Sequence, residues 1–280
     1  MVKSIFELEK RTDIRKECLR IEKYLAKPQF RNFDGYYHNN TFWSMVNSCF
    51  KLWPYRYTAT NASDFFDLLE LHTKVEEMNN TEYFYYLQFI YDFVMWVASY
   101  YYDADIYGIN SNKKILDLFI DNQDEFDLIT TNIKIIMDFS NYSIEKINDH
   151  YTFIKRDADT DSILSIIENE NDLRLALLEY NDFRIENDVE EKKKLIFKIY
   201  QFIELHKKDY QEKNNTLYKS ISHIVNNYKI RHSNSCQISL NDSDTIEVYD
   251  ICFKMMIHLI RDSYIKDSFK KIKEKYESNM

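Results

Sequence analysis

The sequence predicts a mainly α-helical protein, made of helical bundle domains with one short β-hairpin between them. The 280 residues include only two glycines and two prolines. β-Sandwiches, barrels and doubly wound α/β folds need many turns with special dihedral angles, so this composition disfavours them. Hydrophobic residues make up 45% of the chain and aromatic residues 16%, which is enough for a substantial core. Apolar residues also recur at helical spacing along most of the chain.

Residues 1–138 are predicted to form an aromatic-rich helical N-terminal region. Pro28 ends the first predicted helix, and a loop around Asp34 follows. Asn61 and Asn79 stand where helix caps are expected, because Asn side chains accept hydrogen bonds from the first helical turn. The aromatic residues after Asn79 have helical spacing, which favours a buried core over a platform for stacking bases. The predicted helices span 4–26, 42–52, 61–71, 83–102, 111–121 and 123–138.

One stretch departs from helical spacing. Between residues 141 and 156, apolar and polar residues alternate around Asn148-Asp149, as in two strands joined by a tight turn. We therefore predict a β-hairpin connector over 139–157, followed by a helical bundle over 158–280. The bundle helices are expected at 161–180, 188–210, 214–228 and 243–275. Their predicted core contains Ile163, Leu164, Ile167, Leu173, Leu177, Leu195, Ile199, Phe202, Leu217, Ile221, Ile224, Val225, Ile251, Met255 and Leu259.

Charge and cysteine usage limit the possible function classes. The net charge of −9 disfavours broad nonspecific binding to nucleic acid, so any RNA site must be a local basic patch. The four cysteines are scattered and form no CxxC pair, which indicates reduced thiols in a cytoplasmic protein. The aromatic stretch 83–102 contains Gln88 and Asp92, so we expect a buried helix rather than a membrane span. We also expect no signal peptide and no membrane partner.

Two charged patterns have alternative interpretations. Asp157, Asp159, Asp161 and Glu168 match part of the calcium-loop spacing of an EF-hand, but Ser162 stands where the sharp turn needs glycine. The alternative, which we favour, is a helix N-terminus with acids placed on its dipole. No histidine has a metal-ligand spacing with a second ligand, so we expect no metal and no cofactor. The lysines between 266 and 275 are expected to be a solvated helix face.

The candidate functional residues lie in a short polar stretch between two predicted helices. Arg231 and His232 are adjacent there, with Asn227 and Asn234 on either side. A histidine can take or give a proton near neutral pH, and an arginine can hold the charge that builds on phosphorus. This residue pair is therefore suited to breaking a phosphodiester bond. The alternative is a turn whose polar side chains cap the flanking helices.

A family resemblance starts from the same stretch. The segments Ile230-Arg231-His232-Ser233-Asn234 and Leu178-Glu179-Tyr180-Asn181-Asp182-Phe183-Arg184, with a helix beginning near Asp188, resemble bacterial abortive-infection proteins of the HEPN class. The resemblance covers roughly residues 140–275, and more weakly the region from Asp34 to Arg56. It implies a helical bundle that acts as a dimeric, metal-independent ribonuclease. The family's His follows its Arg by four to six residues, whereas His232 is adjacent to Arg231.

This resemblance implies an RNA-cleaving toxin that arrests growth in antiphage defence. His232 is expected to transfer the proton and Arg231 to stabilise the transition state, while Asn227 and Asn234 orient the phosphate or the imidazole. Adjacent side chains on a helix diverge by about 100°, so both reach one phosphate only from a turn, or from two subunits of a homodimer. The alternative function is a catalytically inactive interaction module that binds a protein partner or a second copy. A third is an acidic inhibitor that masks a basic nuclease.

Overall fold

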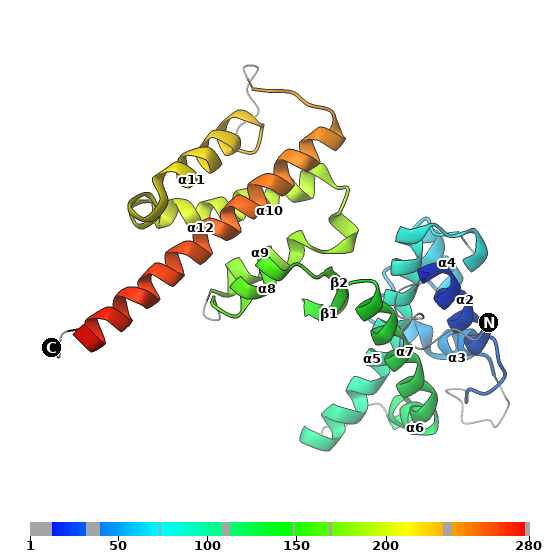
Figure 1. Cartoon of the computed structure of the whole chain (residues 1–280). Helices are drawn as coiled ribbons and strands as arrows, with labels where there is room; N and C mark the ends of the chain where they lie inside the picture. The colour runs from blue at the N-terminus through cyan, green and yellow to red at the C-terminus, as the bar shows by residue number, and fades with distance from the viewer. Residues whose placement is uncertain are drawn as a thin grey trace, which may run out of the picture. The chain divides into compact units, whose positions relative to one another are not determined.

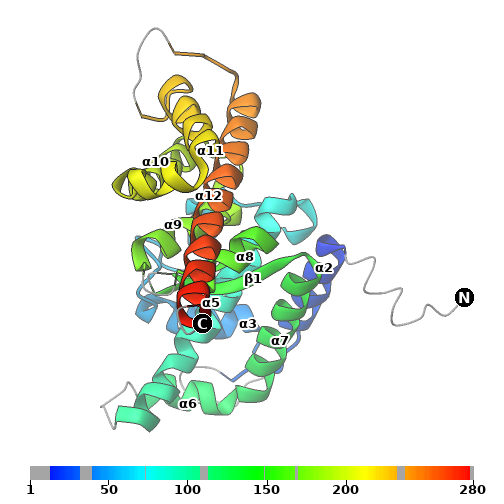
Figure 2. The same ribbon diagram turned by 60° about the vertical axis from the view of Figure 1, so that its left-hand side comes forward.

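The structure, a computed structural model, describes residues 13–31, 40–72, 74–107, 113–147, 149–167, 170–231 and 237–277. These residues form eleven α-helices and one two-stranded hairpin, which confirms the predicted mainly helical fold (Figures 1 and 2). The chain divides into two compact units, Met1–Phe153 (unit 1) and Ile154–Met280 (unit 2). The division falls inside the second strand of the hairpin.

Unit 1 consists of helices, several of which begin at side-chain caps, and one of them is long and rich in aromatic residues. Asp13, Thr41 and Asn61 each accept a hydrogen bond from a backbone N–H in the first turn of their helices. The helices are α2 (Ile14–Leu25), α3 (Phe42–Cys49), α4 (Ala62–Leu68), α5 (Asn80–Tyr107), α6 (Lys113–Asp121) and α7 (Gln123–Phe139), with 3-10 turns at Phe50–Leu52 and Val75–Glu77. The predicted helices at 42–52, 61–71, 83–102, 111–121 and 123–138 therefore exist, with ends shifted by a few residues.

The aromatic helix α5 forms the core of unit 1. Tyr83, Tyr86, Phe89 and Phe93 are all buried. Trp53, which follows α3, meets the ring of Phe89 edge to face, with ring centroids 5.2 Å apart. Such contacts add to the hydrophobic gain from burying large rings. The expectation that these aromatic residues are core is confirmed.

Two polar residues of α5, Gln88 and Asp92, form hydrogen bonds with the hairpin. Strand β1 spans Tyr142–Ile147 and β2 spans His150–Lys155. The side-chain amide of Gln88 donates to the Tyr151 carbonyl (2.8 Å), and the Tyr151 N–H donates to the Asp92 carboxylate (2.7 Å). Both backbone groups of one strand residue are thus paired by α5, so Gln88 and Asp92 are satisfied although they are buried. The hairpin turn uses Asp149 at φ 67° in place of a glycine.

Unit 2 is a helical bundle in which α12 packs against α10 and α11. Its helices are α8 (Ala158–Leu164), α9 (Asn171–Tyr180), α10 (Val189–Leu205), α11 (Lys207–Asn227) and α12 (Asp242–Glu277), with a 3-10 turn at Phe183–Ile185. The single helix predicted over 161–180 is wrong, because this segment forms both α8 and α9. Asp157 accepts a hydrogen bond from the Asp159 N–H and starts α8 early, and Arg174 of α9 donates to the Leu164 carbonyl at the end of α8.

The helix predicted over 188–210 also ends early, at Leu205, where His206 leaves helical geometry (φ −104°, ψ 25°). The start predicted at residue 214 coincides with a kink in α11. Asn214 has non-helical φ and ψ, and its side chain accepts a hydrogen bond from the Leu217 N–H. Asn214 therefore acts as an internal cap between two helical segments.

The predicted core of α12 is partly wrong. Ile251 is 48% exposed, and Met255 is only half buried. The buried face instead starts from Tyr249 and Phe253, because the Phe253 ring stacks on Tyr180 of α9 at 3.9 Å. This face is rotated by one to two residues from the predicted one, and each residue turns a helix by about 100°. Its buried apolar members are Tyr249, Cys252, Phe253, Met256, Ile257, Leu259 and Ile260.

A buried lysine joins three helices of unit 2. Lys192 of α10 has a side chain only 5% exposed, and its ammonium lies 2.6 Å from the Asp250 carboxylate of α12. The Tyr180 hydroxyl of α9 donates to the same carboxylate oxygen (2.7 Å), and the ammonium also lies 4.6 Å from the centre of the Tyr180 ring. Burial, with the neighbouring Asp250 charge, raises the pKa of Tyr180, so its proton stays in place for this bond.

The described cysteines are buried thiols. Cys18, Cys49 and Cys252 are free, and burial raises the pKa of Cys49 and of Cys252 to about 12. A thiol protonated to that extent is unreactive near neutral pH. The fourth cysteine, Cys236, lies outside the described residues. Among the described helices, none is both long enough and apolar enough to cross a membrane.

We predict that Asp250→Ala destabilises unit 2 by about 1–3 kcal/mol, because it removes the acceptor of a buried ammonium and a buried hydroxyl, although the Asp250 side chain is itself 43% exposed and water replaces part of the loss. Urea unfolding should be followed both by circular dichroism and by tryptophan fluorescence. All three tryptophans, Trp43, Trp53 and Trp96, lie in unit 1. The helical signal of unit 2 should therefore melt at lower urea while the fluorescence transition stays unchanged.

The matched control is Lys194→Ala. Lys194 is 66% exposed and pairs with Glu191 one helical turn away on the surface. Such pairs contribute at most about 1 kcal/mol. A loss as large for Lys194→Ala as for Asp250→Ala would show that the buried network has no special role.

We predict that Glu82→Gln destabilises unit 1 at neutral pH but has little effect in acid. The Glu82 carboxylate accepts hydrogen bonds from the N–H groups of Asn79 (2.7 Å) and His72 (2.8 Å) at the start of α5. Burial raises the pKa of this carboxyl, but these donors and the His72 ring outweigh burial and hold the pKa below the ordinary 4.5. The stabilisation is therefore complete above about pH 4.5 and is lost as the pH falls through the lowered pKa.

The expected loss at pH 7 is about 1–2 kcal/mol, measured by tryptophan fluorescence in urea. The difference between wild type and variant should shrink at pH 3. Glu77→Gln is the control, since Glu77 is 53% exposed and pairs with Lys74 on the surface. An equal loss for Glu82→Gln at both pH values would contradict the assigned role.

Candidate functional site

The candidate site begins where α11 ends and the chain turns back. Lys229 adopts a left-handed conformation (φ 60°), which reverses the chain after the helix. The Arg231 N–H then donates to the Val225 carbonyl inside the last turn of α11 (3.1 Å). The hydroxyl of Tyr249 in α12 donates to the carbonyl of Tyr228 (3.3 Å). The backbone of Arg231 is therefore fixed against the helix end rather than free in a loop.

The chain returns to the same helix end a few residues later. The Ile238 N–H donates to the Asn227 carbonyl (2.9 Å), and the Gln237 side chain donates to the Asn226 carbonyl (2.7 Å). The described residues on both sides of 232–236 are thus bound to the last turn of α11. The predicted site residues His232 and Asn234 fall within 232–236, which lies outside the described residues.

Arg231 lies at the surface in an ion pair with Glu204 of α10. Its guanidinium is 2.9 Å from the Glu204 carboxylate, and the two side chains are 35% and 38% exposed. An ion pair this exposed contributes about 1 kcal/mol or less, so a phosphate oxygen can compete for the guanidinium. Sequence analysis did not identify Glu204. It lies 27 residues before Arg231, and no local pattern connects the two.

Asn227 contacts an imidazole, but that of His223. The Asn227 amide nitrogen donates to the His223 carbonyl (2.7 Å) and lies 3.2 Å from Nδ1 of the same ring. The i, i+4 spacing puts both side chains on one face of α11, and His223 is exposed there. This spacing is a sequence signal that could have paired the two residues. The described part of the site therefore holds a guanidinium, a carboxylate, an imidazole and an amide around the end of α11.

A small hollow of about 170 Å³ lies next to the turn at Lys229, where the backbone is left-handed. Tyr228 and Lys229 line it together with Ile238, Asp242 and Tyr249. Arg231 is not among its lining residues. Lys229 and Asp242, which carry opposite charges, both line the hollow. Its small volume suits a few water molecules or one small chemical group. The described residues at the helix end therefore form a surface site rather than a deep pocket.

The calcium-loop pattern forms a helix start instead. Asp157 accepts from the Asp159 N–H and from the Thr160 hydroxyl (2.9 Å), which makes it the N-cap of α8. Asp159 pairs with Arg261 of α12 at 2.6 Å. This arrangement is the helix N-terminus that we favoured. Within the described residues, no group of three or more His, Cys, Asp or Glu side chains could hold a metal ion; Glu168 lies outside them.

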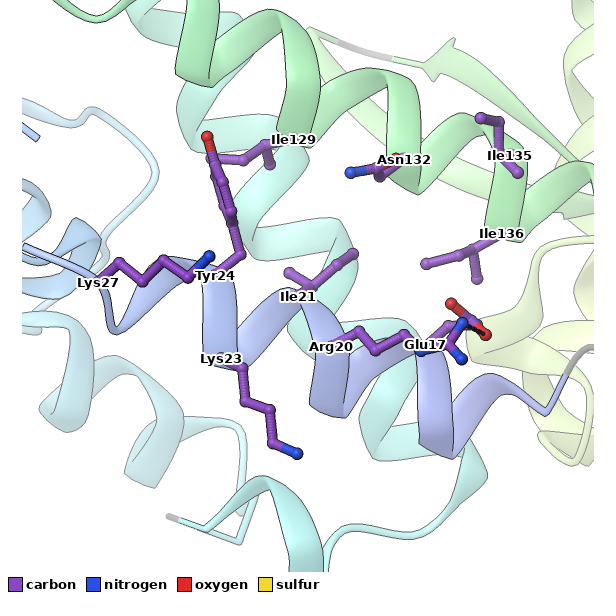
Figure 3. Close-up of a pocket in the computed structure, with 10 residues that line it drawn as sticks. All are labelled: Glu17, Arg20, Ile21, Lys23, Tyr24, Lys27, Ile129, Asn132, Ile135 and Ile136. Atoms are coloured by element: carbon purple, nitrogen blue, oxygen red, sulfur yellow. Dashed lines mark hydrogen bonds and ion pairs between the residues drawn. The ribbon is translucent and has the colours of Figure 1, made fainter. Parts of the chain in front are cut away.

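A larger hollow, of about 510 Å³, lies in unit 1 between α2 and α7 (Figure 3). Part of its wall is apolar, with Ile21 of α2 opposite Ile129 and Ile136 of α7, and the rest is polar, formed by Glu17, Arg20, Lys23, Lys27 and Asn132. Arg20, which stands at its edge, is already paired with Glu17 at 2.7 Å. None of the predicted site residues lines this hollow.

Comparison with protein-family models, with curated proteins and with solved structures found no match to this chain.

We predict that Arg231→Ala and Glu204→Gln each change the free energy of unfolding by less than about 1 kcal/mol, because both side chains are partly solvated. Circular dichroism in urea measures this change. The outcome matters for function, because it allows activity losses in these variants to be attributed to the site. A loss above about 2 kcal/mol would mean that the pair is a structural link between α10 and the end of α11.

Proposed function

We propose that unit 2 is a HEPN-like, metal-independent ribonuclease module that acts in abortive-infection antiphage defence. The observation that supports this proposal is the state of Arg231. Its backbone is anchored to α11, its guanidinium is open to solvent, and its ion pair with Glu204 is weak enough to yield to a phosphate. A buried Arg231 would have ruled out contact with RNA.

The proposed reaction needs only protein groups and the RNA itself. The ribose 2′-oxygen attacks the adjacent phosphorus, a 2′,3′-cyclic phosphate forms, and the bond from phosphorus to the 5′-oxygen breaks. His232 takes the proton from the 2′-hydroxyl or gives one to the leaving 5′-oxygen. Arg231 stabilises the negative charge on the phosphorane-like transition state. Asn227 and Asn234 orient the phosphate or an imidazole.

The proposal includes a homodimer, since Arg231 and His232 are neighbours in sequence. Two-fold symmetry lets Arg231 of one subunit act with His232 of the other at a shared phosphate. In a mixed dimer of Arg231→Ala and His232→Ala subunits, one of the two composite sites would then be intact. Random mixing would give about a quarter of the wild-type sites.

The second candidate is a catalytically inactive interaction module that binds a protein partner or a second copy. The specific observation in its favour is the same ion pair, because Glu204 neutralises the guanidinium that catalysis needs. In this case Arg231 would only join α10 to the end of α11.

We predict that purified full-length protein cleaves bacterial RNA in the presence of EDTA, and that Arg231→Ala and His232→Ala each lower the rate at least a hundredfold. Expression of wild type should arrest bacterial growth during phage infection, and both variants should relieve the arrest. Lys219→Ala is the matched control, since it removes an exposed cation from the same helix, α11. It should keep wild-type activity.

Three outcomes separate the candidates. Cleavage restored by mixing the two inactive variants would establish the shared site. Cleavage lost in both variants but not restored by mixing would mean that each subunit carries its own site. Intact RNA with wild type under every condition, including infection, would refute the ribonuclease proposal and leave the interaction module.

A further inference from the structure

The last fourteen described residues of α12 leave the bundle with an apolar stripe uncovered. Ser263 is the last buried residue among those of this helix whose burial is described, and from Tyr264 to Tyr276 none is buried. Figure 1 shows this end of α12 continuing past α10 and α11. Exposed large side chains recur along it: Ile265 (55%), Phe269 (66%), Ile272 (55%) and Tyr276 (61%). We call residues 264–277 the tail and these four side chains the seam.

The spacing of the seam indicates another helix as its occupant. Its members follow one another at intervals of four, three and four residues, which is the a/d pattern of a coiled coil. A helix that lies on a membrane needs a broader apolar face. Here the four positions that flank the seam at e and g are polar, three lysines and Ser268, so the stripe has the width of one helix–helix contact.

The flanking charges indicate the chemistry of that helix. With Ile265 and Ile272 at d positions, Lys266 and Lys273 occupy e positions and Lys275 a g position. The tail carries five lysines, at 266, 270, 271, 273 and 275, against three acids, at 267, 274 and 277, in a protein whose net charge is −9. Charges at e and g select coiled-coil partners by sign. In an antiparallel pair of two tails, lysines would face lysines, and a parallel pair would gain no contact between opposite charges.

The base of the tail is fixed to the bundle, so it can present the seam in one orientation. Lys213 of α11 donates to the Ser263 hydroxyl (2.9 Å) and pairs with Asp267 (2.5 Å). The Lys266 ammonium donates to the Lys213 carbonyl (2.6 Å).

We propose that the tail is a docking site for an amphipathic helix of a partner protein, with apolar residues at its a and d positions and acids at its e and g positions. The two helices bury the seam, and the acids of the partner face Lys273 and Lys275. This site uses neither Arg231 nor Glu204 and is independent of the proposed ribonuclease activity.

The test uses full-length protein and two synthetic three-heptad peptides, both with Leu at a and d, one with Glu and one with Lys at every e and g position. Fluorescence anisotropy of labelled peptide measures binding at low salt. Wild type should bind the Glu peptide at least tenfold more tightly than the Lys peptide. Lys273→Glu with Lys275→Glu should reverse this preference. Lys270→Glu with Lys271→Glu makes the same charge change away from the seam and should keep it. Phe269→Ser with Ile272→Ser should weaken binding of the Glu peptide at least tenfold.

Several results would overturn the proposal. One is that wild type binds neither peptide, or binds both equally. Another is that both charge-reversal variants behave alike, since the charge of the tail rather than the seam would then determine binding. Light scattering that shows a wild-type dimer lost in the Phe269→Ser, Ile272→Ser variant would identify a second copy as the occupant. Sedimentation with phosphatidylserine vesicles, lost in the same variant, would identify a membrane.

Discussion

Unit 2 depends on a single buried ammonium. Lys192 is only 4% exposed, and an unpaired charge there would cost several kcal/mol. The ammonium is paired with Asp250, and Asp250 with Tyr180, only when α9, α10 and α12 are in register, because each helix contributes one of these three groups. The stacking of Phe253 on Tyr180 follows from the same register. The network thus selects one rotation of α12, and that rotation leaves Ile251 outside the core although it is apolar.

The rotation of α12 also explains why this helix has two different halves. Up to Ser263 its buried face is covered by α10 and α11. Beyond Ser263 the buried face ends, and large apolar residues occur instead on the opposite face of the helix, at coiled-coil spacing. A solvated helix face would tolerate any polar residue at those positions, and Ile and Phe lower its solubility. The lysines of this stretch were predicted to form a solvated face, which agrees with their exposure. The apolar stripe between them was not predicted, because its exposure depends on the rotation of α12, and contacts between distant segments set that rotation.

Features encoded within a few residues could be predicted from the sequence. The Asn61 and Asp188 caps, the hairpin around Asp149 and the start of a helical segment at Asn214 all depend on local hydrogen bonds or turn geometry. Features that join distant segments could not. Lys192 and Asp250 are 58 residues apart, and Glu204 and Arg231 are 27 apart. At the candidate site, sequence reasoning therefore identified Arg231 and Asn227 but missed the Glu204 carboxylate. It also missed His223, although the i, i+4 spacing from His223 to Asn227 is a local signal.

Helix α11 is the element common to both proposed sites. Near its start, Lys213 holds the base of the tail through Ser263 and Asp267, and at its end the carbonyl of Tyr228 accepts the Tyr249 hydroxyl. Helix α12 therefore forms hydrogen bonds with α11 and with the residue after its end, on either side of the Asn214 kink. The contacts that fix the base of the tail lie near the start of α11, and those that fix the turn before Arg231 lie at its end. The two sites therefore use separate contacts on one helix, so a substitution in the seam should leave the surroundings of Arg231 unchanged.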